Sequence, residues 1–251
     1  MKKLLVFLLA CMLTLSGAYA ENGDAELNAL IQQAEQGDAI SQYNLGVEYY
    51  VGGRVEQDYV QAAEWFRRAA EQGDVSGQYW LGYCYEYGLG VSQDYAQMVH
   101  WYTKAAAQGR IDAQYNLGVK YHIGNGVEKD YTQATYWYTK AAEQGHAESQ
   151  YWLAVLYYKG NGVEKDYAQA AYWYAKAAEQ GYADAQYWLG VCYYYGNGVE
   201  QSYTRPKSGP ARSSAKQWLP LRAAFKRIFL KIFPPPHFFL NNFFKLQTVA
   251  G

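Results

Sequence analysis

Few residues of the types that carry out chemistry lie close together in this sequence. Three histidines, His100, His122 and His146, could supply imidazoles for a zinc site or for a general base, but no two of them have the spacing of a metal-ligand pair. Ser213 and Lys216 match the Ser-x-x-Lys arrangement of a serine nucleophile and its lysine, without the Ser-Asp-Asn and Lys-Thr-Gly motifs that normally accompany it. Catalysis needs a nucleophile, a base and an orienting group in one pocket. The sequence therefore predicts a protein without catalytic residues, metal or cofactor.

The balanced overall charge of the chain hides two regions of opposite sign. Residues 21–203 contain 11 Lys or Arg and 23 Asp or Glu, a net charge of −12, whereas residues 204–251 contain nine basic residues and no acidic one. An acidic surface repels nucleic acid and anionic lipid. The expected partners of the main body are therefore proteins or peptides of neutral or basic character, and not nucleic acid.

The first twenty residues have the pattern of a secretory signal peptide. Lys2 and Lys3 precede the apolar run Leu4–Leu15, and Ala18 and Ala20 form a small-residue cleavage site. The run is shorter than the about 20 apolar residues that span a bilayer. We expect cleavage before Glu21 and export to the periplasm or the medium. A lipid anchor at Cys11, after a Leu-Leu-Ala sequence, is the less favoured alternative.

The elements that must position any site recur every 36 residues, which is typical of a repeat protein. The recurring columns are Leu45, Leu81, Leu117, Leu153 and Leu189; Gly37, Gly73, Gly109, Gly145 and Gly181; Trp65, Trp101, Trp137 and Trp173; and Tyr59, Tyr95, Tyr131, Tyr167 and Tyr203. Several columns in one register exclude coincidence. Each period is therefore one structural unit.

Each unit is predicted to contain two helices joined by a tight turn. The first helix spans about Ala39–Tyr50, and its Gly46 indicates a close approach to another helix, since glycine inside a helix otherwise costs about 1 kcal/mol. Gly-x-Gly-Val turns follow, where glycine allows positive φ. Asp58 and its equivalents are placed to cap the second helix, with Gln61 completing a capping box. Gly73 sits where a left-handed helix end belongs.

Helix pairs of this kind bury their apolar sides only by stacking on one another. The predicted fold class is all-α, an α-α superhelix or solenoid of 36-residue helix-turn-helix repeats. We expect a leading helix over residues 26–35, four full repeats over about 39–181, and the first helix of a fifth repeat over 183–195, within a solenoid domain of residues 21–203.

The repeat resembles the Sel-1-like repeat, a relative of the tetratricopeptide repeat. The resemblance rests on Ala-x-Tyr-x-Leu-Gly in the first helix, the Gly-x-Gly-Val turn, and Asp-Tyr-x-x-Ala, Trp and Lys-Ala-Ala-x-x-Gly in the second. It implies a scaffold or adaptor for protein contacts, with exported bacterial members acting at the cell envelope or on a host. Two alternatives stay open: a β-lactam-binding or β-lactam-hydrolysing protein, as described for cysteine-rich relatives, and a self-assembling structural protein of the envelope.

Two cysteines, Cys84 and Cys192, remain after the expected cleavage, three repeats apart. The cysteine-rich relatives have a pair in each repeat, which this chain lacks. Helices stack about 8–10 Å apart, so the two thiols are too distant for a disulfide. We expect both to be small, mostly buried residues, with an intermolecular bridge as the less favoured alternative.

The partner surface is expected on the first helices of the repeats, by analogy with tetratricopeptide arrays. The uniform column Tyr43, Tyr79, Tyr115, Tyr151 and Tyr187 suits structural packing, while a column that varies suits recognition. A rival column on the other shoulder comprises Asn44, Trp80, Asn116, Trp152 and Trp188. The variable column comprises Tyr50, Glu86, His122, Tyr158 and Tyr194, and the predicted partner-binding residues are these five together with Tyr83.

The fifth repeat breaks off after Tyr203. Pro206 and Pro210 forbid the expected second helix, and residues 204–251 form a basic tail rich in Phe and Pro. One hypothesis is an out-of-frame or recombined end. The other is a basic amphipathic helix over residues 221–233 that contacts an anionic membrane or covers the last helix.

Overall fold

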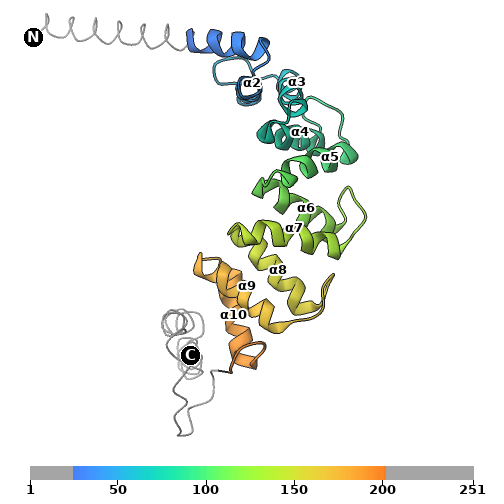
Figure 1. Ribbon diagram of the computed structural model, residues 1–251, viewed down its shortest axis with the longest axis vertical. Coiled ribbons are helices and arrows are strands. Elements are labelled where there is room, and N and C mark those ends of the chain that lie inside the picture. Colours follow the sequence, from blue (N-terminus) through green and yellow to red (C-terminus); the bar gives the residue numbers. More distant parts are fainter. Residues whose placement is uncertain (1–24, 202–251) are drawn as a thin grey trace, which may run out of the picture. The chain divides into compact units, whose positions relative to one another are not determined.

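The computed structural model describes residues 25–201, and these form helices joined by short turns, with no strand among them. Residues 25–35 are helical and lead into nine further helices of 13 residues each (Figure 1). Their bounds are α2 Ala39–Val51, α3 Tyr59–Glu71, α4 Val75–Tyr87, α5 Tyr95–Ala107, α6 Ile111–Ile123, α7 Tyr131–Glu143, α8 Ala147–Lys159, α9 Tyr167–Glu179 and α10 Ala183–Tyr195. The fold is therefore the predicted all-α helical-repeat solenoid, with α2, α4, α6, α8 and α10 as first helices and α3, α5, α7 and α9 as second helices.

The chain divides into two compact units at Ala141 and Ala142, and each is described by itself. In the N-terminal unit, residues 25–141, α2 packs on α3, α3 on α4, α4 on α5 and α5 on α6. In the C-terminal unit, residues 142–201, α8 packs on α9 and α9 on α10. Within each unit these helices pack on their neighbours in the chain, as repeat proteins do. Among residues 25–201 no helix is long and apolar enough to cross a membrane.

Several predictions made from the ends of the chain lie outside the described residues. These are the signal peptide of residues 1–20, the lipid anchor at Cys11, and the basic tail of residues 204–251 with its amphipathic segment 221–233. Two first helices had expected bounds: α2 ends at Val51, one residue after the expected Tyr50, and α10 spans Ala183–Tyr195.

Aspartate caps begin the second helices as predicted. Oδ1 of Asp58 accepts hydrogen bonds from the backbone N–H groups of Val60 (2.8 Å) and Gln61 (3.1 Å), and Asp94, Asp130 and Asp166 repeat this pattern. The reciprocal half of the predicted capping box is wrong. The N–H of Asp58 donates instead to the carbonyl of Tyr49 in the preceding helix (2.9 Å), so a main-chain bond takes the place of the Gln61 side chain.

Close helix packing explains the recurring glycine inside the first helices. A Cβ atom on Gly46 would lie 2.7 Å from the Phe66 ring, and one on Gly118 would lie 2.6 Å from the Tyr138 ring. Both rings belong to the second helix of the same repeat and are fully buried. The prediction that Gly46 permits a close approach of two helices is therefore confirmed.

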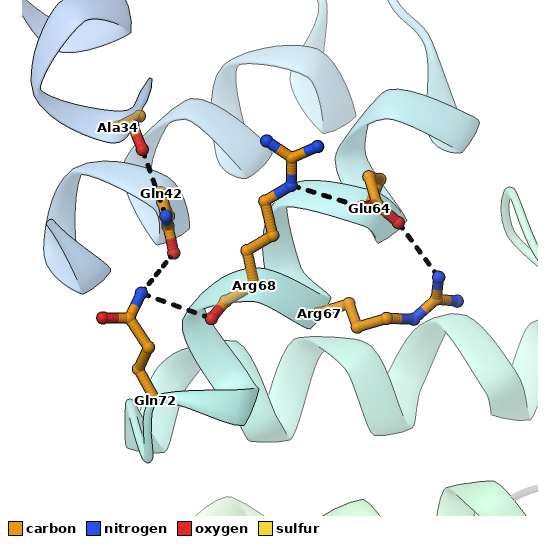
Figure 2. Close-up of polar contacts among 6 residues, drawn as sticks. All are labelled: Ala34, Gln42, Glu64, Arg67, Arg68 and Gln72. Carbon is orange, nitrogen blue, oxygen red and sulfur yellow. Dashed lines mark hydrogen bonds and ion pairs between the residues drawn. The ribbon is translucent and has the colours of Figure 1, made fainter. Parts of the chain in front are cut away.

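Buried glutamines join each first helix to the preceding repeat, a feature that the sequence pattern did not reveal. Nε2 of Gln42 donates to the carbonyl of Ala34 (3.1 Å), and Nε2 of Gln72 donates to Oε1 of Gln42 (2.7 Å) and to the carbonyl of Arg68 (Figure 2). Helix ends leave carbonyls without partners in the helix, and these amides satisfy some of them. The same ladder recurs through Gln78 and Gln108 and through Gln150 and Gln180.

Cys84 and Cys192, the two cysteines among the described residues, are free thiols without exposed surface. Burial raises the pKa of Cys84 to about 12 and that of Cys192 to about 11, so both are protonated at neutral pH. The prediction that they are small buried residues is confirmed.

The buried phenols predict a loss of stability at alkaline pH. Burial raises the pKa values of Tyr102, Tyr138 and Tyr174 well above the ordinary value of 10.0. Above about pH 10 the unfolded chain loses these protons while the folded chain keeps them, so the free energy of unfolding falls by up to about 1.4 kcal/mol per pH unit for each phenol. This stability is complete below about pH 10 and is lost as the pH rises toward the folded pKa values.

Urea unfolding followed by circular dichroism at about pH 8, 10 and 11 measures this dependence. The matched variant is Tyr138→Phe, because Phe66 holds the equivalent position in the first repeat. Its stability should fall less steeply with pH than that of the natural chain. An unfolding midpoint that stays constant over this range would contradict the expectation.

Candidate partner-binding site

The six predicted partner-binding residues all lie toward the C-terminal ends of first helices. Tyr50, Tyr83, His122 and Tyr158 are half-buried, whereas Tyr194 is 47% exposed and Glu86 only 7%. Four of the six belong to the N-terminal unit, and Tyr158 and Tyr194 belong to the C-terminal unit. Within each unit the structure shows what surrounds these side chains.

In the N-terminal unit, Tyr50 joins an aromatic cluster that crosses from the first repeat to the second. Its ring centroid lies 5.0 Å from that of Trp80, 5.4 Å from that of Tyr59 and 6.5 Å from that of Tyr83. The Tyr83 ring lies in turn 4.6 Å from the exposed ring of Tyr87. We call these five residues the N-terminal aromatic cluster.

The C-terminal unit contains the same arrangement three repeats later. Tyr158 lies 5.0 Å from Tyr167 and 5.6 Å from Trp188, measured between ring centroids. Trp188 stacks on the buried Tyr174 at 13°, as Trp80 stacks on the buried Phe66 at 21° in the N-terminal unit. Asn197 donates a hydrogen bond to the Tyr158 hydroxyl (3.1 Å). We call Tyr158, Tyr167 and Trp188 the C-terminal aromatic cluster.

The two columns that the sequence analysis treated as alternative partner surfaces are therefore in contact with each other. Tyr50 belongs to the variable column, Trp80 to the column on the other shoulder of the helix, and each pairs with the other across the boundary between two repeats. Tyr158 and Trp188 do the same. Sequence comparison missed this because it aligns residues 36 apart, whereas these contacts join residues 30 apart.

Glu86, the second residue of the variable column, is a buried group with its own partners. Its Oε1 pairs with Nζ of Lys120 from α6 (2.5 Å), and its Oε2 accepts a hydrogen bond from the Tyr102 hydroxyl of α5 (2.8 Å). Lys120 is only 8% exposed. A buried ion pair thus joins the second repeat to the third, whereas the ring contact of Tyr50 with Trp80 joins the first repeat to the second. The Glu86 carboxylate lies inside the boundary between the second and third repeats.

His122 occupies the same column in the third repeat and lies edge-on to two tyrosines. Its ring centroid is 5.4 Å from that of Tyr131 and 6.0 Å from that of Tyr138. Among the described residues no three His, Cys, Asp or Glu side chains are grouped so as to hold a metal ion. The position of His122 suits packing and edge contact.

The chemistry available at these clusters is that of rings and neutral hydroxyls. Burial, followed by the neighbouring Tyr83, raises the pKa of Tyr50 to about 12. Its hydroxyl is therefore protonated under physiological conditions and serves as a hydrogen-bond donor and acceptor. Rigid aromatic rings with a polar tip provide large contact areas at low entropic cost.

Helix pairs that pack on their sequence neighbours and display aromatic clusters at the boundaries between repeats define a helical-repeat scaffold. The family model of the Sel1 repeat matches residues 39–74, 75–109, 111–146, 147–182 and 183–205. The chain belongs to the Sel1 repeat family. Proteins of this family are typically scaffolds for protein–protein interaction and are generally non-catalytic.

Individual relatives cover parts of the chain. It is 45% identical over 67 residues to the secretory immunoglobulin A-binding protein EsiB of Escherichia coli, which is 25% of this chain and 13% of that protein. A second relative is c5321, a protective antigen present in uropathogenic Escherichia coli strains, whose structure has been solved. Its sequence is 48% identical, and the match covers 70% of this chain and 38% of the c5321 chain with a TM-score of 0.66. A Sel1 repeat protein from Oxalobacter formigenes is 34% identical over 72% of this chain and 75% of its own, with a TM-score of 0.67.

Proposed function

We propose that this chain is an exported, non-catalytic scaffold that binds proteins or peptides through its aromatic clusters. The observation that carries the proposal is the duplicated arrangement in which Tyr50 packs on Trp80 and Tyr158 on Trp188, each half-buried at a boundary between repeats. Aromatic residues that are anchored on one side and accessible on the other are typical of protein interfaces. The proposed partner is neutral or basic and is not a nucleic acid, because residues 21–203 carry a net charge of −12.

The proposed contact residues are those of the variable column and its neighbours. Tyr50, Tyr83, Tyr158 and Tyr194 present rings directly, and His122 presents its ring edge. Glu86 acts from inside the boundary by holding α4 against α6. Export is proposed from the pattern of residues 1–20 and agrees with the nature of two relatives, an immunoglobulin A-binding protein and a protective antigen.

Affinity capture from bacterial envelope extracts tests this function. The immobilised chain should retain one or a few proteins, and Tyr50→Ala or Tyr158→Ala should reduce their recovery at least fivefold, with a smaller loss for His122→Ala. Tyr172→Ala is the matched control, since this tyrosine is 51% exposed on α9 and belongs to neither cluster. Recovery that is equal for all variants would contradict the proposal. So would hydrolysis of a chromogenic β-lactam by the purified chain.

A further inference from the structure

We infer that the N-terminal aromatic cluster receives a lysine or arginine side chain of a basic peptide, with the Tyr59 ring as the seat of the cation. The inference rests on the proposed function and specifies the chemistry of the partner. Four observations carry it: cations over the equivalent rings, the neutral residues that replace them, helix ends without a basic residue, and the local charge.

The chain itself places a cation over the equivalent ring in two later repeats. Nζ of Lys129 lies 4.7 Å from the centroid of the Tyr131 ring, and Nζ of Lys165 lies 4.9 Å from that of the Tyr167 ring. Tyr131, Tyr167 and Tyr59 each begin a second helix, and each lysine precedes its tyrosine by two residues. An ammonium group within about 6 Å of an aromatic face is attracted to it. The tyrosine at this position is thus a ring that binds cations in this fold.

The first, second and fifth repeats have glutamine (Gln57, Gln93 and Gln201) where the third and fourth repeats have lysine. Nε2 of Gln57 donates to the carbonyl of Tyr50 (2.8 Å), and Nε2 of Gln93 donates to the carbonyl of Glu86 (2.7 Å) and to the Tyr95 hydroxyl (3.1 Å). Each amide therefore lies against the end of the preceding helix. Within residues 25–201 no cation lies over the Tyr59 ring, which is 36% exposed.

The last turns of the two first helices beside this cluster contain no basic residue of their own. The C-terminal end of a helix carries a partial negative charge that favours a nearby cation. α6 has Lys120 and His122 in its last turn and α8 has Lys159, whereas the last turns of α2 and α4 contain no basic residue. Tyr50 and Tyr87 lie in those two last turns, and Tyr83 lies one turn before the end of α4. A cation from a partner would supply the positive charge that these two last turns lack.

The surrounding charge is complementary to a basic partner. Residues 25–100 contain 11 acidic and 3 basic residues, a net charge of −8. All three basic residues are arginines paired within the chain: Arg54 with Glu48, and Arg67 and Arg68 with Glu64. Glu56 and Asp58, which closely precede Tyr59 in the sequence, are exposed. Such a field favours association with cationic peptides.

Fluorescence anisotropy with two labelled peptides tests the inference on the full chain. One probe alternates glycine and lysine, and the other replaces each lysine with norleucine. The natural chain should bind the lysine probe at least tenfold more tightly. Tyr59→Leu, which keeps an apolar side chain but removes the ring, should weaken binding of the lysine probe three- to tenfold. Gln57→Lys places an internal cation where Lys129 and Lys165 lie, and should weaken it at least fivefold.

Thr103→Lys is the control for net charge, because it adds one positive charge at an exposed position of α5 outside the cluster. It should weaken binding less than twofold. Equal losses for Gln57→Lys and Thr103→Lys, or unchanged binding by Tyr59→Leu, would overturn the inference. Circular dichroism must show the same helix content in all variants.

The two proposals fail in different ways. If envelope proteins are captured in a manner that depends on Tyr50 but not on Gln57→Lys, the scaffold function stands and the cation seat is wrong. If no protein is captured in a manner that depends on Tyr50 or Tyr158, the proposed function itself is wrong.

Discussion

Replacing Glu86 with alanine is expected to lower the free energy of unfolding by about 3–5 kcal/mol, because it leaves the Lys120 ammonium buried without its carboxylate. The Tyr102 hydroxyl loses its acceptor as well. Urea unfolding of the purified variants, followed by circular dichroism, measures the change. A loss below about 1 kcal/mol would show that water reaches Lys120 and that the pair is not a buried one.

The double variant Glu86→Tyr/Lys120→Cys distinguishes the net contribution of the ion pair from the cost of leaving one buried charge without its partner. Tyrosine and cysteine are the natural residues at the equivalent positions of the boundary between the first and second repeats, namely Tyr50 and Cys84. Replacing both members of a buried ion pair with apolar groups is often neutral or stabilising. The double variant should therefore be more stable than Glu86→Ala by about 2 kcal/mol or more, and a double-mutant cycle should show coupling between the two positions. Additive losses would contradict this reading.

The sequence predicted the helices because their signals are local. Asp58 precedes α3 as its cap, Gly73 has a φ of +93° just after that helix, and Gly46 faces Phe66, all within one repeat. Such positions have the same role in every repeat, so their recurrence identifies them. The reciprocal capping bond failed because the Asp58 N–H had a partner in the preceding helix, which the pattern within the second helix does not show.

The site was predicted only in part, because its contacts join residues of adjacent repeats that occupy different columns. Variation at Glu86 suggested recognition, but the carboxylate is buried because it pairs with Lys120. The column of Lys120 contains the buried apolar residues Cys84, Leu156 and Cys192, and Glu48 is its other charged residue. A glutamate and a lysine 34 residues apart, each at a position that is uncharged in most repeats, are the signal that could have revealed the pair. The contacts between Tyr50 and Trp80 needed the geometry of the stacked repeats.

Replacing Gly90 with alanine is the second change expected to have a large effect. Gly90 has a φ of +69°, and a Cβ atom on it would lie 1.8 Å from the carbonyl oxygen of Tyr59, at the start of the preceding repeat's second helix. That atom is main chain and cannot rotate away, so the turn and the helix must move apart. The positive φ costs about 1–2 kcal/mol for alanine, and overpacking of this kind costs typically about 1–3 kcal/mol more. We expect a total loss of about 2–5 kcal/mol.

Gly88→Ala is the matched control, because it separates strain in the backbone from collision between repeats. Gly88 has a φ of +68° in the same turn, but the nearest atom to its Cβ would be at 3.5 Å, an ordinary contact. Gly88→Ala should therefore lower the free energy of unfolding only by the cost of the left-handed conformation, about 1–2 kcal/mol. Thermal and urea unfolding of both variants measure the difference. Equal losses would mean that the Gly-x-Gly turn does not pack on the preceding repeat. A larger loss at Gly90 would explain why the first repeat has Arg54 at this position and the later ones have glycine: only a turn that packs against an earlier second helix needs a residue without a side chain.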